Sequence, residues 1–262
     1  MMPQRSARLL EAGFSHGFTT RAGGVSVAPF DEADFALLRD ADALRENQRR
    51  LAHALGFDAR RLFQAQQVHG AAVFVPRPDD SALGQLAAAG TSRYPEADAL
   101  VAAVAGDTVA VRVADCVPVL VGDVRTGRVA AIHAGWKGVV AKVVSHALAT
   151  LAASSPSELV AAIGPCIGAC CFEVSREVAE TIAAASTPSC ITRTYEPDKA
   201  RVDLRIAVAA QLAALGMDSA HVDQVGGCTR CDAASYYSFR RDGDNAGRLI
   251  AVITAREATR NA

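Results

Sequence analysis

The sequence lacks an excess of charge of either sign. Its 262 residues hold 27 Lys and Arg against 28 Asp and Glu, so the net charge is −1 and no basic surplus indicates nucleic acid as a partner. No apolar run approaches the roughly 20 residues that span a bilayer, and the first residues lack the apolar segment of a signal peptide. We therefore expect a cytoplasmic protein that binds neither a membrane nor nucleic acid.

Several familiar motifs are also missing. No Gly-x-Gly-x-x-Gly sequence opens a helix after a strand, and no Walker A sequence occurs, which argues against the common nucleotide-binding folds. None of the 6 histidines forms the His-x-His pair of trinuclear copper clusters. The 7 cysteines are an odd number, and in a reducing compartment they favour free thiols over disulfides.

What is present indicates a large α/β core. Hydrophobic residues make up 50% of the chain, which excludes wholesale disorder. Apolar periodicity and capping residues predict helices at residues 40–55, 139–151, 175–185 and 203–216. Strands are predicted at residues 62–68, 71–75, 99–104, 109–113, 117–121, 129–133, 159–163, 220–225 and 249–254. Hairpin-like pairs mixed with strand–helix alternation predict mixed sheets in a single domain over residues 1–262, with a long loop at residues 76–95.

One predicted hairpin carries the densest set of reactive side chains. The strand at residues 117–121 follows Cys116, and the strand at residues 129–133 ends at His133. With a turn centred near Val124 and Arg125, Cys116 faces His133, and opposed residues of an antiparallel pair have Cβ atoms about 4.5–5.5 Å apart. A thiolate and an imidazole at this spacing suit one Zn²⁺ ion, and they equally suit a Cys–His nucleophile pair.

His69 is a third candidate ligand, because it ends a predicted strand just before the turn at Gly70. Two His and one Cys leave a fourth position of Zn²⁺ open for water or substrate, as in catalytic zinc sites. The run His-Ala-Gly-Trp-Lys-Gly from residue 133 favours a site, since two glycines, the only Trp and a Lys make an odd core. The alternative for each residue alone is an ordinary buried side chain.

The remaining cysteines allow a second interpretation. Cys228 and Cys231 form a Cys-x-x-Cys pair, which is typical of half a zinc site or of a redox pair. The other half of a zinc site would have to come from Cys166, Cys170 and Cys171. Because the spacing is not that of a zinc ribbon, we favour buried thiols over a second metal.

Basic and glycine-rich segments are candidates for anion binding. The glycines at residues 163–168 let backbone approach a ligand closely. Arg240 with Arg241, and Arg21 before a glycine turn, offer planar bidentate donors for an oxyanion. The alternatives are a tight structural loop and solvated arginines.

Taken together, these segments resemble the YfiH-like family, long described as multicopper polyphenol oxidases or laccases and now regarded as zinc-dependent purine nucleoside phosphorylases. The similarity covers residues 14–253. It is carried by Thr20-Arg21-x-Gly23-Gly24-Val25-Ser26, Gln67-Val68-His69-Gly70, Ala97-Asp98-Ala99, Ala114-Asp115-Cys116-x-Pro118, His133-Ala134-Gly135-Trp136, Ile163-Gly164-Pro165-Cys166-Ile167-Gly168, and Cys228-Thr229 through Gly247-Arg248.

The resemblance implies zinc on His69, Cys116 and His133. It implies phosphorolysis of adenosine, inosine, guanosine and methylthioadenosine, together with deamination of adenosine. It also implies a layered α/β/β/α fold shared with the catalytic domain of cytotoxic necrotizing factor toxins. In the resulting mechanism, Cys116 and His133 are catalytic through the metal, and Asp115 is a candidate acid or base.

Arg21, Lys137 and Arg240 are the candidate phosphate ligands. Two departures bear on substrate preference and rate: residues 31–38 lack the Asn of the usual Ser-Leu-Asn-Leu stretch, and Lys137 replaces the usual Arg and so loses its planar fork. Partners are then purine nucleosides and phosphate, in a monomer or homodimer.

Three other functions remain open at this point. A copper-dependent polyphenol oxidase is chemically possible, because copper outcompetes zinc for two His and one Cys. A Cys–His hydrolase or deamidase would use Cys116 as nucleophile and His133 as base. A non-catalytic partner-binding protein would hold its zinc with a closed fourth position.

Overall fold

The computed structural model of the protein describes residues 1–37, 39–77, 80, 94–151, 155–195 and 197–259. The helices are α1 (Ala7–Glu11), α2 (Ala41–Leu55), α4 (Trp136–Val140), α5 (Val143–Leu151), α6 (Arg176–Ala184), α7 (Leu204–Ala214) and α8 (Phe239–Asp242). The strands are β1 (His16–Phe18), β2 (Leu62–Phe63), β3 (Val73–Phe74), β4 (Ala99–Ala102), β5 (Thr108–Val113), β6 (Val117–Asp123), β7 (Val129–Ala134), β8 (Leu159–Ile163), β9 (Glu173–Ser175), β10 (Ile191–Tyr195), β11 (Lys199–Val202), β12 (Val222–Gln224) and β13 (Leu249–Thr254).

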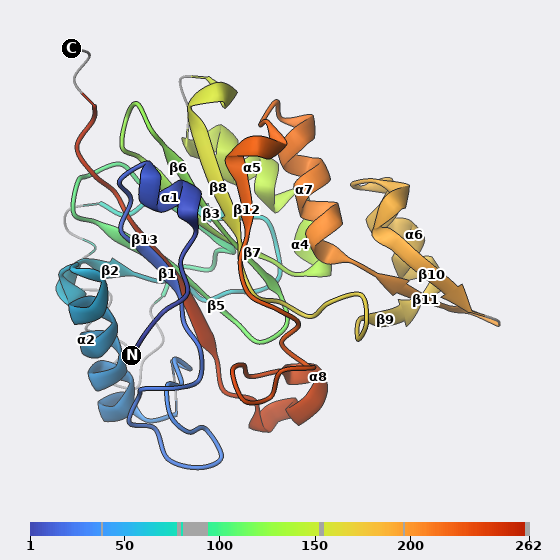
Figure 1. The fold of residues 1–262 in the computed structure, drawn as a ribbon, viewed down its shortest axis with the longest axis horizontal. Helices are drawn as coiled ribbons and strands as arrows, with labels where there is room; N and C mark the ends of the chain where they lie inside the picture. Colours follow the sequence, from blue (N-terminus) through green and yellow to red (C-terminus); the bar gives the residue numbers. More distant parts are fainter. Residues whose placement is uncertain (38, 78–79, 81–93, 152–154, 196, 260–262) are drawn as a thin grey trace.

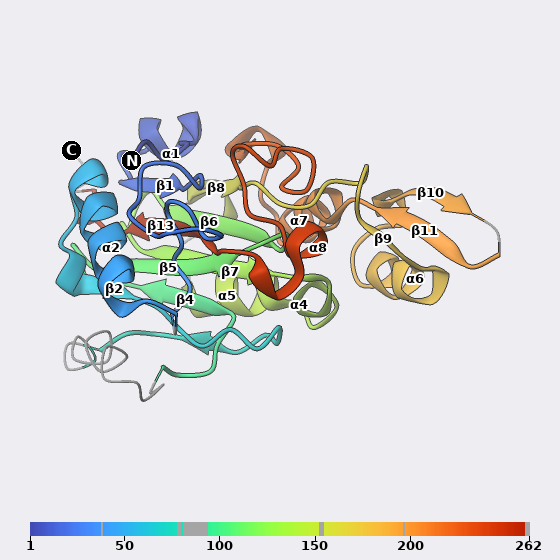
Figure 2. The ribbon, with the colours of Figure 1, turned by 90° about the horizontal axis from the view of Figure 1, so that it is seen from below.

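The strands of the described residues form three sheets. A main sheet has the order β12-β8-β6-β7-β4-β3, and a second sheet has the order β1-β13-β5-β2. Both contain parallel and antiparallel pairs: β12 runs parallel to β8, for example, while β6 runs antiparallel to β7 and β8. A side sheet, β10-β11-β9, lies with α6 at one end of the molecule, whereas α2 lies at the other (Figures 1 and 2).

Alternation along the strands shows that the two larger sheets are stacked between helices. On β6, Val119 and Val121 join the cluster that includes α5 and α7, while Leu120 joins the cluster between the sheets. On β13, Ile253 joins the same inter-sheet cluster, whereas Val252 packs with α2. Because side chains alternate between the faces of a strand, these memberships define helix, sheet, sheet and helix layers. The predicted layered α/β/β/α fold is confirmed.

Capping residues define the helices that the sequence predicted well. Asp40, Ser175 and Asp203 accept backbone N–H groups at the starts of α2, α6 and α7, and Gly56 ends α2 in the left-handed region with φ of 74°. These are the side chains that satisfy the orphan N–H donors of a first helical turn.

The predicted helix at residues 139–151 is wrong in its continuity. It begins earlier, at Trp136, and splits into α4 and α5. Lys142 lies between them with φ of 60°, a conformation that interrupts a helix, and its ammonium group donates to the carbonyl of Ala185. The predicted loop at residues 76–95 falls largely outside the described residues. Of the described helices, none has the length and apolar character needed to cross a membrane.

Candidate active site

The hairpin of β6 and β7 brings Cys116 and His133 together, but not in the predicted register. His133 pairs with Pro118 rather than Cys116, and Val117 pairs with Ala134. The centre of the turn lies one residue further along the chain than predicted. There the Asp123 carboxylate accepts the N–H groups of residues 125 and 126, and Gly127 adopts φ of 73°. The shift leaves Cys116 and His133 on the same face, because the side chains of a strand alternate with period two.

His69 reaches the hairpin from a separate segment. It lies in the loop before β3, which pairs with β4, and β4 in turn pairs with β7. Its φ of 62° is unusual for a residue with a Cβ atom. The rings of His69 and His133 meet edge to face, with centroids 4.9 Å apart.

Asp98, at the start of β4, holds both histidines in place. One carboxylate oxygen accepts the Nδ1–H of His133 at 2.8 Å and the backbone N–H of His69 at 2.9 Å; the other accepts the N–H of Gly70 at 2.6 Å. Asp98 is fully buried, and although burial alone raises its pKa, the hydrogen bonds from His133 and Gly70 lower it overall. A carboxylate behind a histidine sets its tautomer, so the Nε2 atom of His133 is free to face Cys116.

The ligand atoms of His69, Cys116 and His133 (the Cys–His trio) all lie within 4.8 Å of one another. A Cβ atom on Gly135 would lie 2.9 Å from the Cys116 sulfur and 3.1 Å from His69 Cδ2, so only glycine leaves this space open. Two imidazoles and a thiolate are ligands of Zn²⁺ and also of copper. The donor set and the open space therefore fit a divalent metal ion.

The electrostatics of the Cys–His trio favour an anionic sulfur. Burial raises the pKa of the Cys116 thiol, but the charge and hydrogen bond of His133, with those of His69, outweigh it and bring the pKa to about 6. Burial lowers the pKa of His133, yet the Cys116 thiolate and Asp98 raise it to about 9. The thiolate is the form that binds metal and attacks electrophiles.

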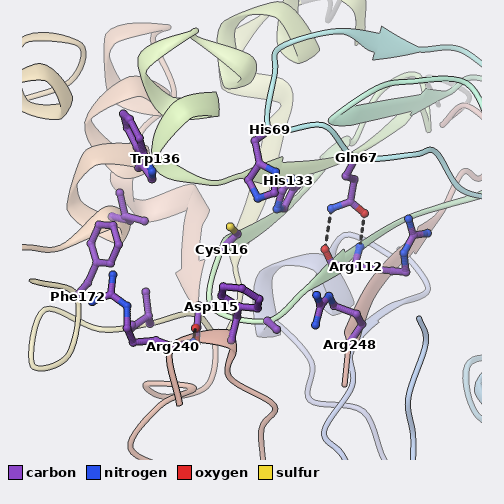
Figure 3. Close-up of a pocket in the computed structure, with 14 residues that line it drawn as sticks. Gln67, His69, Arg112, Asp115, Cys116, His133, Trp136, Phe172, Arg240 and Arg248 are labelled. Atoms are coloured by element: carbon purple, nitrogen blue, oxygen red, sulfur yellow. Dashed lines mark hydrogen bonds between the residues drawn. The ribbon is translucent and has the colours of Figure 1, made fainter. Parts of the chain in front are cut away.

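The Cys–His trio lines a pocket of about 390 Å³ (Figure 3). Trp136, Phe172 and Arg240 lie on one side of the trio in this view, and Arg248 lies on the other. The volume is within the range of about 300–1,000 Å³ that is typical of small-molecule sites. Aromatic walls with a few convergent charges are what such sites share.

Asp115 also lines the pocket, next to Cys116. It is buried with φ of 91°, and its carboxylate is engaged on both oxygens. One oxygen accepts the hydroxyl of Thr229 at 2.6 Å, and the other accepts the backbone N–H of Arg240 at 2.6 Å. These bonds tie the segment before β6 to the start of α8, which makes Asp115 a residue that positions the pocket wall.

Arg240 is the one predicted phosphate ligand that lines the pocket. Arg21 instead donates to the backbone carbonyls of Asp31 and Ala233, and Lys137 is exposed beside Trp136. Neither Arg21 nor Lys137 is among the lining residues, and their role in binding phosphate stays a prediction.

The sequence-based prediction assigned no role to two residues of the site: Asp98, which lies behind His133, and Arg248, which lines the pocket. Asp98 lies in a run of small apolar residues, where a buried carboxylate is a signal that requires explanation. Arg248 lines the pocket with its Nη1 atom bound to the carbonyls of Ala246 and Gly247. Burial and the charge of Arg39 lower the pKa of Arg248, while Asp34, Cys116 and Asp115 act in the opposite direction.

The prediction that the remaining cysteines are buried thiols is only partly right. Cys166 and Cys171 are buried, but Cys170 and Cys231 are exposed and Cys228 is half-buried. The prediction failed because the segment at residues 166–171 and the segment at residues 228–231 meet through a parallel bridge between Cys166 and Cys228, a contact that local spacing does not reveal.

Comparison with known proteins places this site in a family. Residues 15–256 match the family described as multi-copper polyphenol oxidoreductase laccase. The chain belongs to this family. Family members named purine nucleoside phosphorylase include YlmD of Geobacillus stearothermophilus, which is 34% identical over 94% of this chain and 92% of its own, and a protein of Deinococcus radiodurans, which is 35% identical over 91% and 88%.

Solved structures of the family have the same fold. The crystal structure of YlmD from Geobacillus stearothermophilus superposes with a TM-score of 0.86 at 32% identity, covering 96% of this chain and 94% of that one. The crystal structure of the Bacillus licheniformis hypothetical protein YfiH superposes with a TM-score of 0.84 at 27% identity, covering 93% of each chain. The predicted membership of the YfiH-like family is confirmed.

Proposed function

We propose that this protein is a zinc-dependent purine nucleoside phosphorylase that also deaminates adenosine. The observation that carries the proposal is the Cys–His trio at the centre of a pocket lined by aromatic rings and arginines. The names of the curated relatives support the phosphorylase activity. We extend the substrates to adenosine, inosine, guanosine and methylthioadenosine.

His69, Cys116 and His133 would hold the zinc ion, with Asp98 orienting the imidazole of His133 and binding the backbone N–H of His69. When bound there, zinc supplies Lewis acidity at a position that the three protein ligands leave open. A copper ion is the alternative occupant, since the same donors bind it more tightly.

The pocket residues supply binding and orientation. A planar purine suits the rings of Trp136 and Phe172, and a phosphate suits the guanidinium groups of Arg240 and Arg248. In phosphorolysis, a phosphate oxygen bonds to the anomeric carbon as the bond from that carbon to the purine nitrogen breaks. The purine leaves with the electron pair of that bond and takes up the proton that the phosphate gives up. Holding the two reactants in line and stabilising the charge that develops are the main contributions available to these side chains.

The test is product analysis with adenosine as substrate. With phosphate present, phosphorolysis yields adenine and ribose 1-phosphate; without phosphate, deamination yields inosine. Formation of neither product by protein whose zinc content is confirmed would refute the proposal. Metal analysis of protein made without added copper distinguishes zinc from copper.

One observation favours a second candidate, a Cys–His hydrolase. Cys116, His133 and Asp98 have the order of nucleophile, base and orienting carboxylate, and the sulfur is activated by the imidazolium. This candidate predicts activity that survives chelation and an acyl group on Cys116. The phosphorylase proposal predicts loss of activity on chelation and recovery with zinc.

A further inference from the structure

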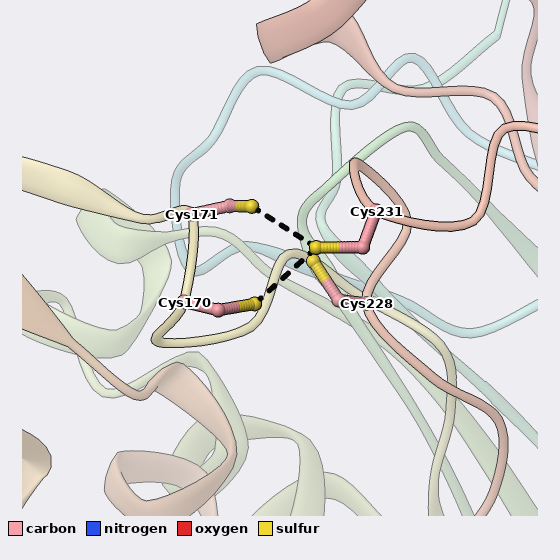
Figure 4. Close-up of side chains that lie close together, drawn as sticks. All are labelled: Cys170, Cys171, Cys228 and Cys231. Carbon is pink, nitrogen blue, oxygen red and sulfur yellow. Dashed lines mark hydrogen bonds between the residues drawn. The ribbon is translucent and has the colours of Figure 1, made fainter.

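Four cysteines gather outside the pocket. Cys170 and Cys171 follow β8, and Cys228 and Cys231 follow β12. Their sulfur atoms all lie within 4.8 Å of one another, and Figure 4 shows the side chains converging from two separate loops. We call them the four-cysteine cluster.

Backbone pairing brings the two loops together. β8 and β12 run parallel, with Ile163 beside Gln224, and beyond their ends Cys166 and Cys228 form a further parallel bridge. The N–H of Thr229 donates to the carbonyl of Cys166 at 2.9 Å. The cluster is therefore built on the frame of the main sheet and does not depend on an exposed loop alone.

Two of the four sulfur atoms have hydrogen-bond donors beside them. Cys228 Sγ accepts the backbone N–H of Gly168 at 3.2 Å and those of Arg230 and Cys231. The Arg230 guanidinium lies 3.6 Å from the Cys171 sulfur. Hydrogen bonds from N–H groups and a nearby cation stabilise thiolates, and thiolates are the form that binds metal.

Gly168 leaves room for the sulfur atoms of the four-cysteine cluster. A Cβ atom there would lie 3.3 Å from both the Cys170 sulfur and the Cys228 Cβ atom, so a side chain would press on the cluster.

The distances fit one ion in the centre better than disulfides. Cys231 Sγ lies 3.3 Å from Cys171 Sγ and 3.6 Å from Cys170 Sγ, whereas bonded sulfurs are about 2.05 Å apart. Four sulfurs at about 2.3 Å from a tetrahedral zinc ion are roughly 3.8 Å from one another. All four cysteines are free thiols in the structure.

We propose that the four-cysteine cluster is a structural zinc site, separate from the Cys–His trio. Four protein thiolates complete a tetrahedral shell and leave no position for substrate, which is the mark of a structural rather than a catalytic site. The zinc ion clamps the loop after β8 to the loop after β12. The clamp holds the pocket wall, because Phe172 follows Cys171 directly and Thr229 donates to Asp115.

The experiment counts metal in variants of the whole protein. Each is expressed without added metal, purified with a reductant, and analysed for zinc and iron by mass spectrometry. The two sites together predict about two zinc ions per chain in the unmodified protein. Cys231→Ser, at an exposed position, lowers the count to about one, Cys116→Ser also lowers it to about one, and the double variant retains none.

A matched control is Cys190→Ala, which removes a thiol that belongs to neither site and leaves about two zinc ions. Circular dichroism shows whether each variant is folded, and a folded Cys116→Ser protein that keeps its second zinc supports the proposal even if no nucleoside is cleaved. A zinc count unaffected by Cys231→Ser, or iron in place of the zinc that Cys231→Ser removes, overturns it. A single zinc that is lost in Cys231→Ser but kept in Cys116→Ser supports it and counts instead against zinc at the Cys–His trio. A disulfide among these cysteines, seen as fewer titratable thiols with one zinc, overturns it as well.

Discussion

Asp98→Asn tests how far the protein scaffold prepares the Cys–His trio. The carboxylate accepts hydrogen bonds from the Nδ1–H of His133 and from the N–H groups of residues 68–70, at distances from 2.6 to 3.3 Å. The amide of Asn keeps one oxygen that can accept these hydrogen bonds. Its NH₂ group replaces the second oxygen and cannot accept the N–H donors that faced it. The His133 imidazole loses the charged group that orients it, and the backbone of His69 loses its acceptor.

Loss of such an outer partner typically lowers metal affinity by about 10–100-fold. That range corresponds to about 1.4–2.8 kcal/mol, at 1.4 kcal/mol for each factor of ten. We expect the dissociation constant for zinc, measured by competition with a chromogenic chelator, to rise within this range. Nucleoside cleavage at saturating zinc should fall as well, because the His133 imidazole no longer keeps one orientation.

The matched control is Asp223→Asn, which also removes a carboxylate that accepts a backbone N–H, here that of Arg8 at 2.9 Å, but lies outside the pocket. It should lower the free energy of unfolding without changing zinc affinity. A zinc dissociation constant for Asp98→Asn within about twofold of the unmodified value would refute the idea that Asp98 prepares the site.

Three further predictions concern the glycine at the trio, the pocket arginine and a buried histidine. Gly135→Ala places a methyl group 2.9 Å from the Cys116 sulfur and should abolish zinc binding at the Cys–His trio. In the control, Gly227→Ala, the added methyl group meets no atom within 4 Å, so zinc binding should be kept. The metal content of each variant is the measurement. Arg248→Met should raise the KM for phosphate roughly 10- to 100-fold, because it removes charged hydrogen bonds worth about 1.5–3 kcal/mol. Arg60→Met, at the surface, should leave the KM unchanged, and both are measured by steady-state kinetics with varied phosphate. Burial lowers the pKa of His16, whose ring accepts the Ser6 N–H, so its contribution to stability is complete above the ordinary His value of about 6.5 and is lost as the pH falls below it, by up to about 1.4 kcal/mol per pH unit. His16→Gln should flatten this dependence in urea unfolding between pH 7.5 and 5.5, and an unchanged slope would assign it to other groups.

Local signals explain why much of the fold could be predicted. Asp40, Ser175 and Asp203 cap helices within a turn of where the sequence places them, because capping depends on the nearest N–H groups. β8 and β13 begin and end where their apolar runs do. By contrast, β10 is largely exposed to solvent, so its sequence has no alternation of apolar and polar residues from which a strand could have been predicted.

The parts of the site that come from neighbouring segments of the sequence could be predicted, whereas the parts that come from distant segments could not. Cys116 and His133 belong to one hairpin, so strand pairing alone brings them close. The turn shifted their register because the Asp123 carboxylate binds the backbone of residues 125 and 126, a side-chain effect that apolar patterning ignores. Arg248 reaches the pocket only through the packing of β13 against β5, which joins segments far apart in the chain.

The three side chains of the Cys–His trio meet solvent unequally. His133 is buried and Cys116 half-buried, whereas His69 is exposed and comes from its own loop. Of the three side chains, His69 is therefore the one that a competing ion or a chelator would reach most directly from solvent. Because copper displaces zinc from such donors, the metal found in a purified sample depends on the metal ions in the buffers and resins used during purification. Samples prepared without metal-affinity resins or added salts are the ones whose metal content reports the biological ion.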